Sequence, residues 1–200
     1  HRDLHSFPTR RSSDLIFAGI YIFMKTIQIH DKTFVLFIPH EQIQSAITEL
    51  SKKILESYGD KTPLFVCVLN GAFMFASDLC KAYNGKAEIA FIRLASYEGT
   101  STTGKVKQIL GLDTNIAGRD LIILEDIVDS GITVDFLISE LQKQKPKSIR
   151  VATLLLKPDA LQKPVKPDYV GIELSNDFVV GFGLDYNDLG RNLKDIYKII

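Results

Sequence analysis

Apolar residues follow two different spacings along the chain. Between residues 41 and 58 they recur at intervals of three, four and seven, which predicts a helix over Glu41–Tyr58 with one apolar face. Leu64–Leu69 is instead a continuous apolar run, rich in β-forming residues and too short for a globular helix. That run predicts a strand buried on both faces, and Gly59 ends the helix before it.

The same alternation continues to the end of the chain. Strand-like residues occupy 27–36, and a polar loop, Ser96–Gly104, precedes the segment 105–111. Further helices are expected over 72–83 and 132–143, and further strands near 87–95, 120–125, 148–156, 169–173 and 178–182. Buried strands that alternate with helices predict an α/β fold with a mainly parallel central sheet flanked by helices. Ligands should then bind outside the carboxyl ends of the central strands.

The first 23 residues differ in character from the rest. The apolar run Leu15–Met24 follows two arginines and so imitates a secretory signal, but no small-residue cleavage site follows it. It has about half of the roughly 20 residues that span a bilayer, so no transmembrane helix is expected. Residues 1–15 resemble translated adaptor or upstream DNA, and Met24 looks like an ordinary start. We therefore expect 1–23 to be a non-native extension and 24–200 to be one domain.

Composition excludes several classes of protein. The 200 residues are 46% hydrophobic, enough for one domain with a substantial core. Lys plus Arg and Asp plus Glu each total 24, so no global basic field favours nucleic acid as a partner. The two cysteines, Cys67 and Cys80, lie in apolar runs away from histidine, which indicates neither a disulfide framework nor a zinc site. A reducing, cytoplasmic location is expected.

The segment 121–133 carries the clearest chemical signal. An apolar strand is followed by the carboxylates of Glu125 and Asp126, and then by the small polar loop Asp129–Thr133, which opens a helix. Amides before a helix favour a phosphate, and carboxylates accept from sugar hydroxyls or from water on magnesium. A ribose 5-phosphate fits both features, because it carries a phosphate for the amides and hydroxyls for the carboxylates. The alternative is ordinary turn and N-cap chemistry, whereas a Walker A loop and a GxGxxG turn are both absent.

This segment resembles the type I phosphoribosyltransferases, whose hallmark is an apolar strand, an acidic pair and Asp-x-Gly-x-Thr. Further motifs are similar to the hypoxanthine-guanine phosphoribosyltransferases over essentially all of 24–200. The resemblance implies a fold with a small hood and a mobile lid loop. It also implies transfer of the 5-phosphoribosyl group from phosphoribosyl pyrophosphate (PRPP) to N9 of hypoxanthine or guanine with Mg²⁺, giving IMP or GMP plus pyrophosphate.

The resemblance assigns PRPP contacts to several loops. Leu69–Phe73 looks like the family's first loop, which often carries a strained peptide bond and in many relatives has lysine in place of Asn70. Ser96 and Tyr97 would open the lid over 99–104. The implied PRPP contacts are Asn70, Gly71, Ser96, Tyr97, Glu125, Asp126, Asp129, Ser130, Gly131, Ile132, Thr133 and Arg191. For Gly71 there is also a physical reason, because backbone that approaches a phosphate closely tolerates no Cβ.

The resemblance also implies a purine subsite and a metal site. Lys157 would donate to the oxygen on purine C6, Phe178 would stack on the base, and Val179 would offer main-chain hydrogen bonds. Asp185 would complete the purine subsite and bind Mg²⁺, with Glu125 and Asp126 as further metal ligands. A fixed ammonium can donate to a carbonyl but cannot accept from an amino group, which disfavours adenine. Asp129 is assigned as the general base by the resemblance and by its place in the loop that reaches both ligands.

Two alternatives remain open at this stage. A regulatory protein could bind PRPP without catalysis, although the purine-subsite residues favour an enzyme. An enzyme that prefers xanthine cannot be distinguished by these residues from one that prefers hypoxanthine or guanine, because xanthine presents the same C6 oxygen. The resemblance also implies a homodimer or homotetramer.

Overall fold

The computed structural model describes residues 25–98 and 105–200, with side chains described outside 95–110. The extension 1–23 and the lid 99–104 therefore lie outside the described residues. No helix in the described ranges is long and apolar enough to cross a membrane.

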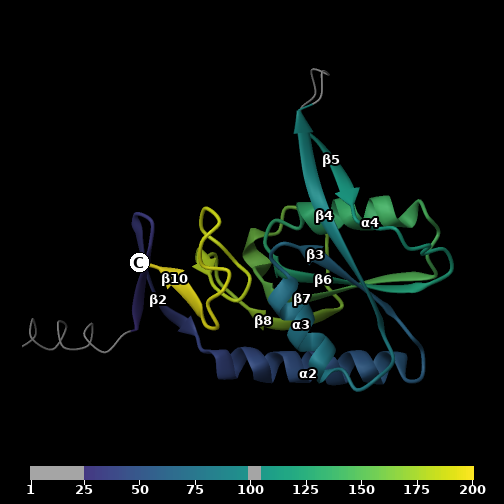
Figure 1. The fold of residues 1–200 in the computed structure, drawn as a ribbon, viewed down its shortest axis with the longest axis horizontal. Helices are drawn as coiled ribbons and strands as arrows, with labels where there is room; N and C mark the ends of the chain where they lie inside the picture. The colour runs from purple at the N-terminus through teal and green to yellow at the C-terminus, as the bar shows by residue number, and fades with distance from the viewer. Residues whose placement is uncertain (1–24, 99–104) are drawn as a thin grey trace, which may run out of the picture.

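A six-stranded sheet and the helices that cover its two faces form the larger part of the molecule, which we call the body (Figure 1). Its strand order is β5-β4-β3-β6-β7-β8, and every neighbouring pair is parallel except the antiparallel pair β4 and β5. The bounds are β3 (Leu64–Leu69), β4 (Glu88–Glu98), β5 (Lys105–Leu110), β6 (Asp120–Val128), β7 (Ser148–Leu156) and β8 (Tyr169–Glu173). The predicted mainly parallel sheet is confirmed.

Helices cover both faces of this sheet, which explains why its central strands are apolar throughout. On one face, α2 (His40–Tyr58) and α3 (Phe73–Ala82) pack against alternate residues of the strands, such as Phe65 and Cys67. On the other face, α4 (Ile132–Gln142) packs against the intervening residues, such as Val66. Successive side chains of a strand point to opposite faces, so both sets must be apolar.

A second, smaller sheet, together with residues 181–195 between its strands β9 and β10, forms the hood. It is antiparallel with strand order β1-β2-β10-β9, and Phe34 and Tyr197 are buried within it. The bounds are β1 (Thr26–Ile29), β2 (Lys32–Ile38), β9 (Val179–Val180) and β10 (Ile196–Ile199). The sheet therefore joins the beginning of the described chain to its end (Figure 1).

Several predicted boundaries were wrong. β4 continues through Ser96 and Tyr97, which pair with Lys107 and Val106 of β5, so the polar loop begins later than predicted. β6 continues to Val128, because its pairing with β7 does not stop at Glu125. The strand predicted over 178–182 has only two residues, and β10 was not predicted. Both hood strands depend on partners from distant parts of the chain.

Candidate functional site

The acidic pair lies inside the molecule near the carboxyl end of β6. Glu125 is 6% exposed, and burial together with the neighbouring carboxylate of Asp126 raises its pKa well above the ordinary value. Burial also raises the pKa of Asp126 to about 6, although its Oδ1 accepts a hydrogen bond from the Ile127 amide at 2.8 Å. A buried carboxylate with a second carboxylate as its chain neighbour is costly unless a cation or a donor joins it. The pair is thus suited to a ligand.

Two glycines allow three loops to meet at this carboxylate pair. A Cβ on Gly71, just after β3, would overlap the Asp126 carboxylate. A Cβ on Gly183, which has a φ of +100° in the hood, would overlap the carbonyl of Gly71. The glycine at 71 predicts a phosphate close to the backbone, but the neighbour that the structure shows is the side chain of Asp126. The preceding Leu69–Asn70 peptide bond is cis, and Asn70 is exposed.

The predicted phosphate loop turns sharply from β6 into α4. Gly131, with a φ of +76°, is the N-cap residue of the helix and occupies the left-handed region that favours glycine. The carbonyl of Ser130 accepts a hydrogen bond from the Gln162 amide at 2.9 Å, which braces the loop against the chain after β7. The first amides of a helix have no intrahelical acceptor, and Ile132 and Thr133 occupy these positions. The loop can therefore receive an anion.

The strand-end lysine does not reach solvent. The side chain of Lys157 is only 9% exposed, and its Nζ lies 2.8 Å from Oδ2 of Asp129, whose side chain is 51% exposed. The backbone amide of Lys157 donates to the carbonyl of Val128 at 2.9 Å, which aligns the loops after β6 and β7. The predicted base and the predicted purine donor thus form one ion pair.

The hood supplies the side of the candidate site that faces this ion pair. Oδ1 of Asp185 forms an ion pair with Nη2 of Arg191 at 2.6 Å, and its Oδ2 accepts a hydrogen bond from the Asp188 amide at 2.8 Å. Nη1 of Arg191 donates to the carbonyl of Gly183 at 2.7 Å. Phe178 is 44% exposed and meets Tyr186 edge to face, with ring centroids 5.9 Å apart. Its ring is therefore not core and can present a surface to a planar ligand.

A cavity of about 290 Å³ lies between the body and the hood. From the body it is lined by Asp126, Ile127, Asp129 and Lys157, and from the hood by Phe178, Val179, Leu184 and Asp185. All four predicted purine-subsite residues and the predicted base therefore surround one space. Asn70 and the residues 130–133 do not line it, and Ser96 and Tyr97 belong to the β4–β5 hairpin.

The cavity includes residues that sequence reasoning missed. Ile127 and Leu184 line it, but aliphatic side chains carry no chemical signal. Gly183 was also missed, although the Gly-Phe-Gly sequence at 181–183 is a signal that backbone approaches closely there.

The predicted magnesium ligands fit the metal only if substrate phosphates complete the site. Among the described residues, no three Asp, Glu, His or Cys side chains gather closely enough to hold a metal ion. Mg²⁺ commonly binds through one or two carboxylates together with substrate phosphates. Asp126 and Asp185 match that mode, because both line the same cavity, whereas Glu125 does not line it.

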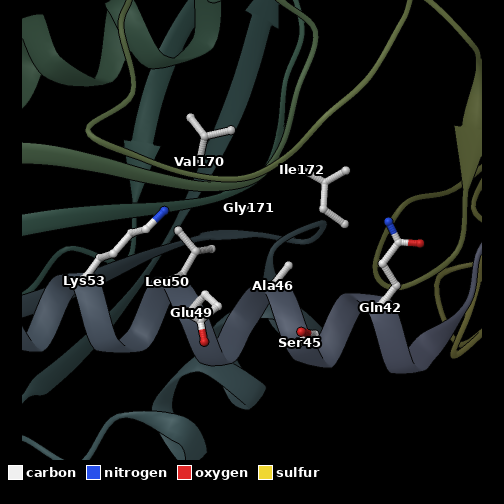
Figure 2. A pocket seen from close by; sticks show the side chains of 9 residues that line it. All are labelled: Gln42, Ser45, Ala46, Glu49, Leu50, Lys53, Val170, Gly171 and Ile172. Atoms are coloured by element: carbon white, nitrogen blue, oxygen red, sulfur yellow. The ribbon is translucent and has the colours of Figure 1, made fainter.

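Another cavity, of about 260 Å³, lies between α2 and the edge strand β8 and contains none of the predicted residues (Figure 2). Its polar side chains, Gln42, Ser45, Glu49 and Lys53, all come from α2, whereas β8 contributes Val170, Gly171 and Ile172. Glu49 already pairs with Lys52 at 2.7 Å. The cavity between body and hood is therefore the candidate active site.

The chain is similar to known proteins over most of its length. The model of the phosphoribosyl transferase domain matches residues 39–187. The hypoxanthine-guanine phosphoribosyltransferase of Bacillus subtilis (strain 168) is 43% identical over 168 residues, which cover 84% of this chain and 93% of that protein. The enzyme of the same name from Mycobacterium avium is 43% identical over 163 residues, 78% of this chain and 80% of that protein.

Solved structures show the same relationship. The crystal structure of a hypoxanthine-guanine phosphoribosyltransferase from Bacillus anthracis has a TM-score of 0.74 and 34% identity, over 82% of this chain and 96% of that one. The hypoxanthine phosphoribosyltransferase from Staphylococcus aureus has a TM-score of 0.75 and 36% identity, with 82% and 90% covered. A variant of the Trypanosoma cruzi enzyme, solved as a ternary substrates complex, has a TM-score of 0.76 and 32% identity, with 90% and 97% covered.

Proposed function

Because this chain belongs to the phosphoribosyltransferase family and matches its hypoxanthine-guanine members over most of its length, we propose the following reaction for its cavity. The enzyme serves purine salvage by transferring the 5-phosphoribosyl group of PRPP to N9 of hypoxanthine or guanine, which gives IMP or GMP and pyrophosphate. The observation that carries this proposal is the meeting of Asp129, Lys157, Phe178, Val179 and Asp185 around one cavity.

The purine occupies the space between Phe178 and the ion pair. Phe178 stacks on the base, and main-chain groups of Val179 bond to its edge. The ammonium of Lys157 donates to the C6 oxygen, while the carboxylate of Asp129 takes the proton at N7 as N9 attacks C1 of the ribose. The 2.8 Å separation of Lys157 and Asp129 supports this pairing, because O6 and N7 are neighbours on one edge of a purine.

PRPP extends from the purine toward α4. Its 5-phosphate is held by the loop Asp129–Thr133, whose amides and hydroxyls lie at the amino end of α4. Glu125 and Asp126 accept hydrogen bonds from the ribose hydroxyls, and Arg191 with the amides near Gly71 holds pyrophosphate. Ser96 and Tyr97, at the end of β4, lead into the lid. Closure over the sugar would exclude water, which competes as a nucleophile.

We propose Mg²⁺ as the cofactor, held by Asp185, Glu125 and Asp126 together with PRPP. When bound, it neutralises charge that develops on the leaving pyrophosphate. Glu125 and Asp126, whose pKa values burial raises, would in turn gain a stabilising cation.

The test is an assay on the purified protein with PRPP and hypoxanthine, guanine, xanthine or adenine, with nucleotide and pyrophosphate both quantified. We expect product from hypoxanthine or guanine, none from adenine, and loss of turnover with EDTA that added Mg²⁺ restores. Binding of PRPP without product from any base would support the regulatory alternative. Product from xanthine alone would identify a xanthine-preferring relative.

Two wider proposals accompany this activity. The cytoplasm is the proposed location, because highly charged phosphorylated substrates do not cross a bilayer unaided. A homodimer or homotetramer is the proposed assembly, and size-exclusion chromatography with light scattering gives the mass directly. A monomer at assay concentration would contradict the second proposal.

A further inference from the structure

Asp195 is a buried carboxylate that the proposed chemistry does not use. It immediately precedes β10 in the hood and is 5% exposed. Its Oδ1 accepts a hydrogen bond from the backbone amide of His40 at 3.0 Å. Its Oδ2 accepts from Nζ of Lys25 at 2.7 Å and from the hydroxyl of Tyr197 at 3.3 Å. One side chain therefore joins three separate segments of the chain.

The bond to His40 connects the hood with the body. His40 is the first residue of α2, whose apolar face packs into the core beneath the six-stranded sheet. The chain leaves the hood at this point, since β2 ends at Ile38. The imidazole of His40 adds a contact with the carbonyl of Lys194, at 3.3 Å from Nδ1. The junction thus holds the start of a body helix against the segment before β10.

The backbone of the same segment supports the hood side of the cavity. A Cβ on Gly181, with a φ of +102°, would overlap the carbonyl of Asp195. The turn from Gly181 to Leu184 is closed by two backbone hydrogen bonds, of 3.0 and 3.1 Å. Leu184 and the next residue, Asp185, line the cavity. Asp195 therefore contacts the cavity-forming turn through its backbone and the body through its side chain.

Hydrogen bonds also tie this turn to the loop segment that precedes Asp195. The amide of Phe182 donates to the carbonyl of Leu193 at 2.8 Å, and the amide of Gly183 donates to the carbonyl of Arg191 at 2.9 Å. Movement of the segment 191–195 relative to α2 would therefore move Asp185 and Leu184 as well. The opposite side of the cavity, with Asp129 and Lys157, stays on the body.

We propose that Asp195 is a positioning residue for the purine subsite. By anchoring the hood to the amino end of α2, it sets the spacing between Phe178, Val179 and Asp185 on one side and Asp129 and Lys157 on the other. It touches no substrate. This inference rests on the proposed function, because the spacing matters only if a purine must contact both sides at once.

The experiment compares Asp195→Ala, Asp195→Asn and the wild type in the PRPP and hypoxanthine assay. Misplacement by about 1 Å can cost on the order of 100-fold, so we expect the KM for hypoxanthine to rise about 10- to 100-fold in Asp195→Ala. Asn retains an oxygen that accepts from the His40 amide, so Asp195→Asn should recover most of this loss. Lys25→Met keeps that bond and should change KM less than Asp195→Ala.

A second measurement separates positioning from general damage. The Kd for ribose 5-phosphate should be unchanged in every variant, because the 5-phosphate loop belongs to the body. Asp113→Ala, at an exposed body aspartate, is the matched control and should behave as the wild type. Should Asp195→Ala fail to fold, Asp195→Asn and Lys25→Met still allow the KM for hypoxanthine to be compared with the Kd for ribose 5-phosphate.

Two results would overturn the inference. One is an unchanged hypoxanthine KM in folded Asp195→Ala while the wild type is active. The other is an equal loss of affinity for ribose 5-phosphate, which would indicate a merely structural role. A wild type that binds ribose 5-phosphate but forms no nucleotide would refute the proposed function itself, and is thereby distinguished from both.

Discussion

Asp129 and Lys157 neutralise each other's charge at the edge of the cavity. Lys157 is nearly buried, so its ammonium needs a partner, and the carboxylate 2.8 Å away supplies it. A purine that enters the cavity must accept a hydrogen bond from the Lys157 ammonium through its C6 oxygen and donate the N7 hydrogen to the Asp129 carboxylate. The pair therefore holds both groups in place before substrate arrives, and removal of either one leaves the other unpaired.

Asp129→Asn should lower kcat by about 10²- to 10⁴-fold, the usual contribution of a general base, with little change in PRPP affinity. Single-turnover kinetics on the variant and on Asp159→Asn, an exposed aspartate nearby, measures this directly. Near-normal turnover in Asp129→Asn would disprove the assignment of the base.

Lys157→Ala should raise the KM for hypoxanthine by about 10- to 100-fold, because a charge-assisted hydrogen bond of about 1.5–3 kcal/mol is lost. Steady-state kinetics against Lys166→Ala, an exposed lysine, provides the comparison. Unaltered hypoxanthine affinity would place the purine elsewhere.

Asp126→Asn should stabilise the ligand-free protein at neutral pH while it reduces activity. Because burial raises the pKa of Asp126 from 3.8 to about 6, the unfolded chain loses this proton at lower pH than the folded one. Wild-type stability therefore falls as the pH rises from about 4 to 6, by up to about 3 kcal/mol. Asn keeps the acceptor for the Ile127 amide and carries no charge.

Thermal unfolding of Asp126→Asn and wild type at pH 4 and pH 7 checks this prediction. The difference in Tm should be small at pH 4 and should favour the variant at pH 7. A lower Tm for the variant at pH 7 would show that the buried carboxylate is already compensated in the ligand-free protein.

At the scale of elements, local patterns predicted the body well and the hood poorly. The predicted bounds of β3, β7 and β8 were correct. For β3 the signal was a continuous apolar run, which arises because helices cover both faces of the sheet. β10 has no comparable signal. Ile196–Ile199 is short and includes Lys198, and it becomes a strand only because β2, about 160 residues earlier, pairs with it. Long-range pairing of this kind is invisible to local periodicity.

Contact between elements also explains the glycine in the first loop. Gly71→Ala should destabilise the protein by about 1–3 kcal/mol, because the new methyl group overlaps the Asp126 carboxylate of β6. Chemical denaturation measures the loss, and adding Asp126→Ser, which shortens the neighbour, should restore part of it. If the second substitution restored nothing, the Asp126 contact would not be the reason for the glycine.

The whole molecule consists of two sheets that meet at the substrate cavity. The sequence pattern of residues 1–23 predicts a non-native extension. We therefore expect a protein that starts at Met24 to keep the Tm and the turnover of the full chain. Calorimetry and the nucleotide assay on the shortened protein test this, and a protein that no longer folds would show that 1–23 belongs to the domain.

The α/β class, the parallel body and the acidic pair before the phosphate loop could all be read from the amino-acid sequence. These features are local, because burial on two faces requires unbroken apolar strands and a phosphate loop requires small residues at a helix start. The pairing of Lys157 with Asp129, the pairing of Arg191 with Asp185 and the contact of Asp195 with α2 became visible only in the folded protein. These contacts bring together residues from separate loops, and their spacing depends on how the two sheets pack.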